Sequence, residues 1–179
     1  MNRREHVLNA VLLATGIAIL LAPAGGSQTA EILVALSMPL VLGALFPDVD
    51  VSFGEHRKTF HNLPVLGVFV AWPAVVGNLQ FVWLGVLTHY VLDMLGTHRG
   101  IALLYPWRRE FEVPVGVPVD SAWVLPVTLV VTGVEVAAVG VLLQVGGPLG
   151  GIGPGVGATI PPWLEAVVVQ GLRTLGLDG

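Results

Sequence analysis

Histidine and aspartate occur at a spacing that suits metal binding within an apolar run of this chain. In "LTHYVLDML", Leu87–Leu95, His89 and Asp93 are four residues apart. On a helix this spacing places both side chains on one face, with Cβ atoms about 5–6 Å apart. An ionisable pair inside a membrane helix is costly, and a metal ion held by both side chains would offset that cost. The pair is therefore a candidate metal site; alternatively, Asp93 reaches water at the helix end and only orients His89.

A second polar segment, "FPDVDVSFGEHRKTFHNL" (Phe46–Leu63), interrupts the apolar sequence. Its candidate site residues are Asp48, Asp50, His56, Arg57 and His61. Pro47 ends the preceding helix, and residues two apart in an extended segment point the same way, so we expect Asp48 and Asp50 to face one ion. Arg57 is a candidate for binding an anionic group. The alternatives are a solvated helix cap for the aspartates and, for Arg57, a charge that only sets membrane orientation.

The types of ligand narrow the choice of metal. The chain contains no cysteine, so histidine and carboxylate must hold any ion. Mixed imidazole and carboxylate ligands suit zinc, with manganese or iron as alternatives, and they disfavour magnesium. The candidate metal ligands are His6, Asp48, His56, His61, His89 and Asp93. Because they outnumber the ligands of one ion, the sequence is compatible with two metals, or with one metal whose ligands are oriented by the remaining groups.

The elements that must position these residues are apolar helices. Of the 179 residues, 54% are hydrophobic and 11% are charged, against about 25% charged in soluble domains. Apolar runs near the roughly 20 residues of a membrane span lie at Val7–Ala24, Glu31–Phe46, Leu63–Leu79, Phe81–Leu95 and Ala122–Val145. We therefore predict an all-α, multi-spanning transmembrane bundle of four or five spans, with the metal ligands at its cytoplasmic helix ends. The first run also fits a cleavable signal peptide.

Basic residues indicate the orientation of the chain in the membrane. Seven of the eight basic residues precede the first span, follow the second or follow the fourth, whereas the loop after the first span and the loop after the third contain none. The positive-inside rule therefore predicts a multi-pass protein of the cell membrane with a cytoplasmic N-terminus. All five histidines then fall near the cytoplasmic side. Nucleic acid is disfavoured as a partner because the chain has no basic stripe to neutralise phosphates.

Composition also divides the chain into segments. Residues 1–120 are expected to form the membrane-embedded core, and residues 121–145 a further transmembrane helix that carries a lone Glu135. Residues 146–162 are rich in glycine and proline and are expected to form an external loop. Residues 163–179 are expected to form a short interfacial helix, with Trp163 at the headgroup level.

The order of the motifs resembles the YdjM-like family, LexA-regulated, inner-membrane-associated proteins that are predicted to be metal-dependent hydrolases. The resemblance rests on a histidine near the start of the first helix, "GALFPDVD", "HRKTFHNL" and "GVLTHYVLDMLGTHRGIALLYPW", and covers residues 6 to about 114. It implies a hydrolase site at His6, Asp48, Asp50, His56, His61, His89 and Asp93. The chain has Val51-Ser52 where relatives often have His-Pro, and Phe60-His61-Asn62 where they have Thr-His-Ser, so one ligand and one hydroxyl donor are missing.

The combined hypothesis is a membrane-bound, metal-dependent hydrolase that activates water. Asp50, the aspartate left over from metal binding, would act as general base, and Arg57 would stabilise developing negative charge. The segment Ile101–Pro118 would lie on the membrane and guide an amphiphilic, phospholipid-like or other phosphoester substrate to the site. Two alternatives stay open: a proton-coupled or ion-coupled transporter, and a membrane scaffold or regulator with a structural metal.

Overall fold

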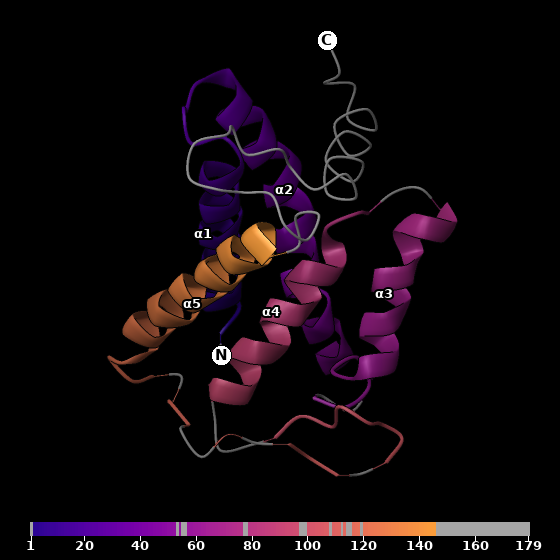
Figure 1. The fold of residues 1–179 in the computed structure, drawn as a ribbon. Coiled ribbons are helices and arrows are strands. Elements are labelled where there is room, and N and C mark those ends of the chain that lie inside the picture. Colours follow the sequence, from indigo (N-terminus) through magenta and orange to yellow (C-terminus); the bar gives the residue numbers. More distant parts are fainter. Residues whose placement is uncertain are drawn as a thin grey trace.

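A computed structural model describes residues 2–52, 54, 57–76, 79–96, 100–107, 109–111, 113, 116–118 and 120–145. Over these residues the chain is helical, and the only pairing of β type is an isolated bridge between Ile101 and Phe111. The elements are α1 (Arg3–Leu21), α2 (Ser27–Leu45), the 3-10 helix η1 (Pro47–Ser52), α3 (Leu63–Val76), α4 (Val82–Leu95) and α5 (Val124–Val145) (Figure 1). The predicted all-α bundle of apolar helices is confirmed.

The helices differ in whether they are long enough to cross a bilayer. Helices α1, α2 and α5 are long and apolar enough to do so. Helices α3 and α4 have 14 residues each, and 14 residues at a rise of about 1.5 Å extend about 21 Å, less than the roughly 30 Å hydrocarbon core. The third and fourth predicted spans, α3 and α4, are therefore apolar helices that are shorter than the hydrocarbon core is thick.

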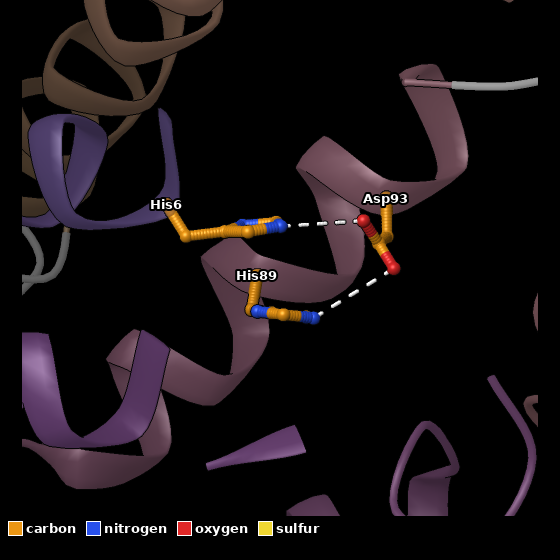
Figure 2. Close-up of side chains that lie close together, drawn as sticks. All are labelled: His6, His89 and Asp93. Atoms are coloured by element: carbon orange, nitrogen blue, oxygen red, sulfur yellow. Dashed lines mark ion pairs between the residues drawn. The ribbon is translucent and has the colours of Figure 1, made fainter. Parts of the chain in front are cut away.

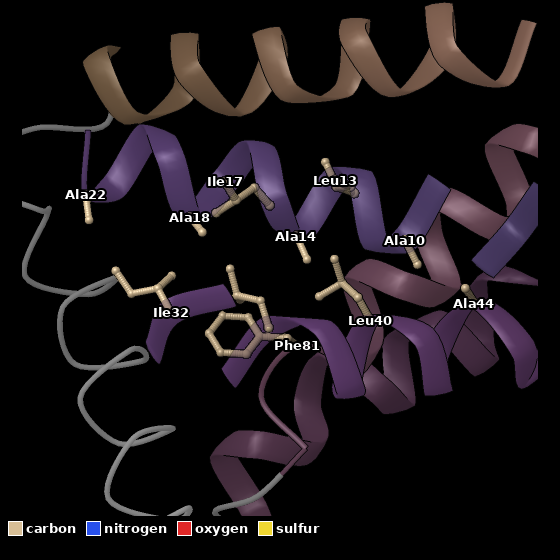
Figure 3. Close-up of a cluster of buried hydrophobic side chains, with 11 residues drawn as sticks. Ala10, Leu13, Ala14, Ile17, Ala18, Ala22, Ile32, Leu40, Ala44 and Phe81 are labelled. Atoms are coloured by element: carbon tan, nitrogen blue, oxygen red, sulfur yellow. The ribbon is translucent and has the colours of Figure 1, made fainter. Parts of the chain in front are cut away.

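Small side chains hold α1 against α2. Ala10, Ala14 and Ala18 recur every four residues along one face of α1 and are 0–1% exposed. They pack against apolar side chains of α2 such as Leu36 and Leu40 (Figure 3). In a membrane the lipid is as apolar as the helix surface, so close contact through small residues is a main source of helix association.

The crossing of α2 and α4 is closer still, because it uses two glycines. A Cβ atom built on Gly43 would overlap the carbonyl oxygen of Val82, and one built on Gly85 would overlap that of Leu40. The backbones are thus in direct contact, and any larger residue would push the helices apart. This contact fixes how deeply α4, the helix of His89 and Asp93, packs into the bundle.

The aspartates after α2 lie in a helical turn, so the expectation of an extended segment was wrong. Phe46 keeps helical dihedral angles (φ −59°, ψ −46°), and proline fits the first turn of a following helix because its φ is near −65°. The chain therefore tightens into η1 instead of extending. With about three residues per turn, Asp48 and Asp50 point in different directions.

Helix α5 joins the same bundle as the preceding helices, packing mainly along α1 (Figure 1). Val136 of α5 lies against Gly16 of α1, where a Cβ atom would overlap it. Residues 146–162 and 163–179, for which an external loop and an interfacial helix were predicted, lie outside the described residues.

Replacing Gly85 by alanine is expected to destabilise the protein by about 3 kcal/mol or more, because the added methyl group meets backbone atoms that cannot move away separately. Thermal unfolding in detergent, followed by circular dichroism, measures the effect. Gly67→Ala in α3 is the matched control, because nothing lies within 4 Å of a Cβ at that position. Equal melting temperatures for the two variants would contradict the close α2–α4 crossing.

Candidate metal centre

The candidate site lies at one end of the bundle, where four segments meet. The first turn of α1 supplies His6, and α4 supplies His89 and Asp93 near its C-terminus. The other contributors are Asp48 and Asp50 of η1, and Arg57 and His61 of the connection to α3. The start of α1 and the ends of α2 and α4 lie at the lower side of the bundle in Figure 1. Alternating helix direction brings these ends together, although the residues are up to 87 positions apart.

Two histidines are held by hydrogen bonds through their Nδ1 atoms. His89 Nδ1 lies 2.6 Å from the carbonyl oxygen of Ala44, which can only accept, so this nitrogen donates. His61 Nδ1 lies 3.1 Å from Asp50 Oδ2 and donates to that carboxylate. The proton of each neutral ring is thereby assigned to Nδ1, which makes each Nε2 an acceptor.

The two Nε2 atoms face one another at 3.0 Å. Two lone pairs at this distance repel unless a cation lies between them or one ring carries a second proton. Two nitrogens bound at about 2.0–2.1 Å to a tetrahedral zinc ion lie about 3.3 Å apart. Backbone or carboxylate hydrogen bonds to the far ring nitrogen are also the usual orienting contacts of metal-binding histidine. Both observations fit a metal site.

Asp93 is the carboxylate that the histidines share. Its Oδ1 is 3.3 Å from His6 Nε2, while its Oδ2 is 3.4 Å from His61 Nε2 and 3.7 Å from His89 Nε2. Figure 2 shows the Asp93 carboxylate beside the stacked rings of His6 and His89, with one oxygen facing each ring. Arg57 Nη2 approaches the same Oδ2 at 3.4 Å and the Asp93 carbonyl oxygen at 3.4 Å. The predicted His89–Asp93 pair thus lies at the centre of a larger cluster.

His6 contributes an imidazole whose hydrogen bonding is incomplete. Its ring stacks on that of His89, with centroids 3.8 Å apart and an interplanar angle of 15°. The side chain is fully buried; its Nδ1 has no hydrogen-bond partner among the described residues, and its Nε2 makes only the 3.3 Å ion-pair approach to Asp93 Oδ1. Burying an unpaired polar atom costs about 1–3 kcal/mol. A bound cation would give this nitrogen a partner.

The donor atoms form two groups that share His89. His6, His89 and Asp93 make one group, and Asp48, His61 and His89 make the other; within each, the ligand atoms lie within 4.8 Å of one another. Asp48 Oδ1 lies 3.8 Å from His89 Nε2, and its side chain is 14% exposed. The described residues of the cluster include three carboxylates, those of Asp48, Asp50 and Asp93, and one guanidinium, that of Arg57. The arrangement can hold one divalent ion, or two ions bridged around His89.

Seven of the eight residues predicted for the site therefore lie together: His6, Asp48, Asp50, Arg57, His61, His89 and Asp93. His56 lies outside the described residues, as does His98. Asp48 and Asp50 were expected to face one ion, and this was wrong. Asp48 is directed at His89, whereas Asp50 is directed at His61.

Two residues that were not predicted from the sequence, Asn62 and Tyr90, support the site. The Tyr90 hydroxyl donates to the Phe60 carbonyl at 2.5 Å and accepts from the Asn62 backbone N–H at 3.2 Å. The Asn62 side chain donates to the carbonyl groups of Lys58 and Thr59 and accepts from the Val65 N–H, capping α3. These contacts fix the loop of His61 against α4. The sequence signal that could have predicted the role of Tyr90 is its hydroxyl group directly after His89 in an apolar helix.

A family model described as YdjM inner membrane protein matches residues 1–148. The match includes all five helices and every site residue described above, and it extends beyond the motifs of residues 6 to 114 to take in α5. No curated protein and no solved structure matches the chain. The family and the three long apolar helices agree in assigning the chain to a membrane.

Replacing Tyr90 by phenylalanine is expected to loosen the loop of His61. The change removes only the hydroxyl group and leaves the Phe60 carbonyl and the Asn62 N–H without this partner, a cost of about 1–3 kcal/mol. Hydrogen exchange should increase over residues 57–62 more than in α1 or α2. Tyr105→Phe is the control, because the Tyr105 hydroxyl makes no hydrogen bond to the described residues of the cluster. Unchanged exchange in Tyr90→Phe would refute the anchoring role.

Proposed function

The chain belongs to the YdjM inner membrane protein family, and we propose that it is a membrane-bound, metal-dependent hydrolase. The observation that carries the proposal is the 3.0 Å approach of His61 Nε2 and His89 Nε2, each with its Nδ1 engaged by an orienting acceptor. Such a pair is built to bind a cation. Zinc suits the mixture of imidazole and carboxylate, with manganese or iron as alternatives.

The residues that would hold the metal are His61 and His89, with Asp93, Asp48 and His6 completing the two groups. The buried ring of His6, whose Nδ1 has no hydrogen-bond partner, and the excess of carboxylates among the described residues fit an ion of charge +2. When bound, such an ion supplies Lewis acidity and an activated water nucleophile at neutral pH.

The geometry favours different roles for the two aspartates of η1. Asp50 was predicted to be the general base, but it is fully buried and its Oδ2 contacts His61 Nδ1. In our proposal Asp50 orients His61 so that its Nε2 faces the metal site. Asp48 is the more accessible carboxylate and lies beside His89, so it is better placed to accept a proton from the attacking water.

Arg57 is the residue proposed to bind the anionic part of the substrate. Its side chain is 11% exposed and approaches Asp93 through Nη2, so it lies beside the metal ligands at the edge of the cluster. Its backbone has φ +67°, a left-handed conformation that is uncommon outside glycine. A guanidinium can bind phosphate oxygens in pairs and stabilise charge that develops during hydrolysis. A phosphoester is therefore our proposed substrate class.

The site is proposed to face the cytoplasm, at the membrane surface, in a multi-pass protein. The basic residues near the N-terminus and after α2 support this orientation. Trp107 and Trp123, between α4 and α5, are 73% and 69% exposed, and exposed tryptophan is typical of the headgroup region. An amphiphilic substrate could then reach the cluster from the lipid surface.

A scaffold with a structural metal is the second candidate, and the burial of the cluster favours it. His6, His61 and His89 are all 0% exposed, and structural metal sites are closed while catalytic sites keep an open position. The two candidates share the metal and differ in turnover, so the two tests below separate them.

The metal content of the purified protein tests the site itself. Wild-type protein in detergent, supplied with zinc and washed, is expected to retain about one or two ions per chain by elemental analysis. Asp93→Asn and His89→Ala should lose the metal while staying helical, and Asp50→Asn should weaken binding by about 10–100-fold. Asp120→Asn, an exposed aspartate outside the cluster, should behave as wild type. Folded wild-type protein that retains no zinc, manganese or iron would exclude the proposal.

Turnover of a phosphoester tests catalysis. With zinc bound, wild-type protein is expected to hydrolyse a member of a panel of soluble and lipid phosphate esters. Arg57→Gln should lower kcat by about 100-fold with the metal retained, because a charge-stabilising group is removed. Lys58→Gln is the control, since Lys58 pairs with Glu110 at 3.7 Å. Metal-loaded protein without turnover on any ester would support the scaffold instead.

A further inference from the structure

A cavity of about 380 Å³ lies between α1, α4 and α5, away from the metal cluster. Its lining is aliphatic and aromatic except for Thr88 and Glu135. Leu87 and Leu142 line it and are also 37% and 65% exposed, so it opens to the outer surface of the bundle. In Figure 1, α5 runs diagonally across α1, the helix along which it mainly packs. The volume falls within the range of about 300–1,000 Å³ typical of ligand pockets.

The two polar lining residues belong to a network that joins three helices. Asn9 Nδ2 donates to Thr132 Oγ1 at 2.9 Å and to Glu135 Oε2 at 2.8 Å. Thr88 Oγ1 lies 2.6 Å from Asn9 Oδ1 and 2.5 Å from Glu135 Oε1. Thr132 gives its own hydrogen to the Thr128 carbonyl, so it accepts from Asn9. The four side chains form a polar floor beneath the apolar cavity.

Counting hydrogens determines the charge of this floor. Thr88 Oγ1 has one hydrogen but two close oxygens, and neither Asn9 Oδ1 nor an ionised Glu135 can supply another. A proton on Glu135 completes the network, because Glu135 Oε1 then donates to Thr88 and Thr88 donates to Asn9. The floor is thus neutral and satisfied internally. The floor therefore has no charge that would attract a cationic ligand. Its polar hydrogens are all used within the network, so none is available to a polar ligand.

We infer that this cavity binds one hydrocarbon chain of a membrane lipid. The walls are apolar, the floor is neutral, the opening is at the surface of helices that lie in the membrane, and the surrounding bilayer supplies such chains. Along α1, His6, Asn9 and Leu13 follow at intervals of three and four residues on one face. The polar floor therefore separates the bound hydrocarbon chain from the metal cluster. Binding of this hydrocarbon chain does not depend on the proposed hydrolase activity.

Photo-crosslinking tests directly whether a lipid hydrocarbon chain occupies the cavity. Full-length protein is reconstituted in phosphatidylcholine vesicles that contain a phospholipid with a photoactivatable group at the end of one acyl chain. Labelled peptides are identified by mass spectrometry. Labelling is expected at lining residues of α1, α4 and α5, such as Leu13, Leu84 and Val139. Labelling confined to outward residues that do not line the cavity, such as Val34 and Val130, would overturn the inference.

A pair of neighbouring alanines supplies the matched variants. Ala138 lines the cavity and Ala137 does not, so Ala138→Phe fills it while Ala137→Phe only adds bulk beside it. Cavity labelling should fall about tenfold in the first variant and stay unchanged in the second. Leu142→Trp, at the rim, gives a second filling variant should Ala138→Phe fail to fold. Equal labelling in folded filling variants and in Ala137→Phe would refute the site.

Two further variants test the neutral floor and separate this site from the metal centre. Glu135→Gln keeps one donor and one acceptor without charge, so labelling should stay at the wild-type level; a tenfold loss would contradict a neutral floor. Asp93→Asn should also label as wild type. Loss of labelling in folded Asp93→Asn would indicate that the hydrocarbon chain belongs to a molecule bound at the metal centre. That result would overturn the assignment of the hydrocarbon chain to a membrane lipid.

Discussion

The close crossing of α2 and α4 is the constraint on which the site depends. Gly43 and Gly85 bring the two backbones into contact, and the next residue of α2, Ala44, then presents its carbonyl oxygen to His89 Nδ1. That hydrogen bond sets which nitrogen of His89 faces the cluster. Because η1 follows α2 directly, the same crossing carries Asp48 and Asp50 to the end of α4. A small change in the distance between these helices would alter every contact of His89.

Two polar layers lie next to each other in this apolar bundle, and they are satisfied in different ways. In the layer of Asn9, Thr88, Thr132 and Glu135, donors and acceptors match once Glu135 is neutral, so that layer is complete by itself. Among the described side chains of the histidine layer, acceptors gather: two Nε2 atoms face each other, and the Asp93 carboxylate lies beside them. Buried polar groups need partners, and a cation is the partner that we propose for this second layer.

Family membership and geometry contribute separate parts of the functional argument. The family match covers all five helices and assigns the chain to a membrane. The contacts of His61, His89 and Asp93 support metal binding without reference to any relative. Hydrolysis goes one step beyond both, and the balance between catalysis and a structural metal depends on how water and substrate reach Asp48 and Arg57, the partly exposed members of the cluster.

The sequence by itself determined the helices, their apolar character and the identities of the clustered residues. A spacing of four on a helix sufficed to pair His89 with Asp93, since helical periodicity is local. Tertiary structure decided the rest: the direction of Asp50 towards His61, the stacking of His6 on His89, and the link between Asn9 and Glu135. In a membrane helix both the lipid-facing and the buried sides are apolar, so the pattern of residues does not reveal which face is inside. That choice was made by small residues such as Gly43, Gly85 and Ala14, which allow some helix faces to approach closely and not others.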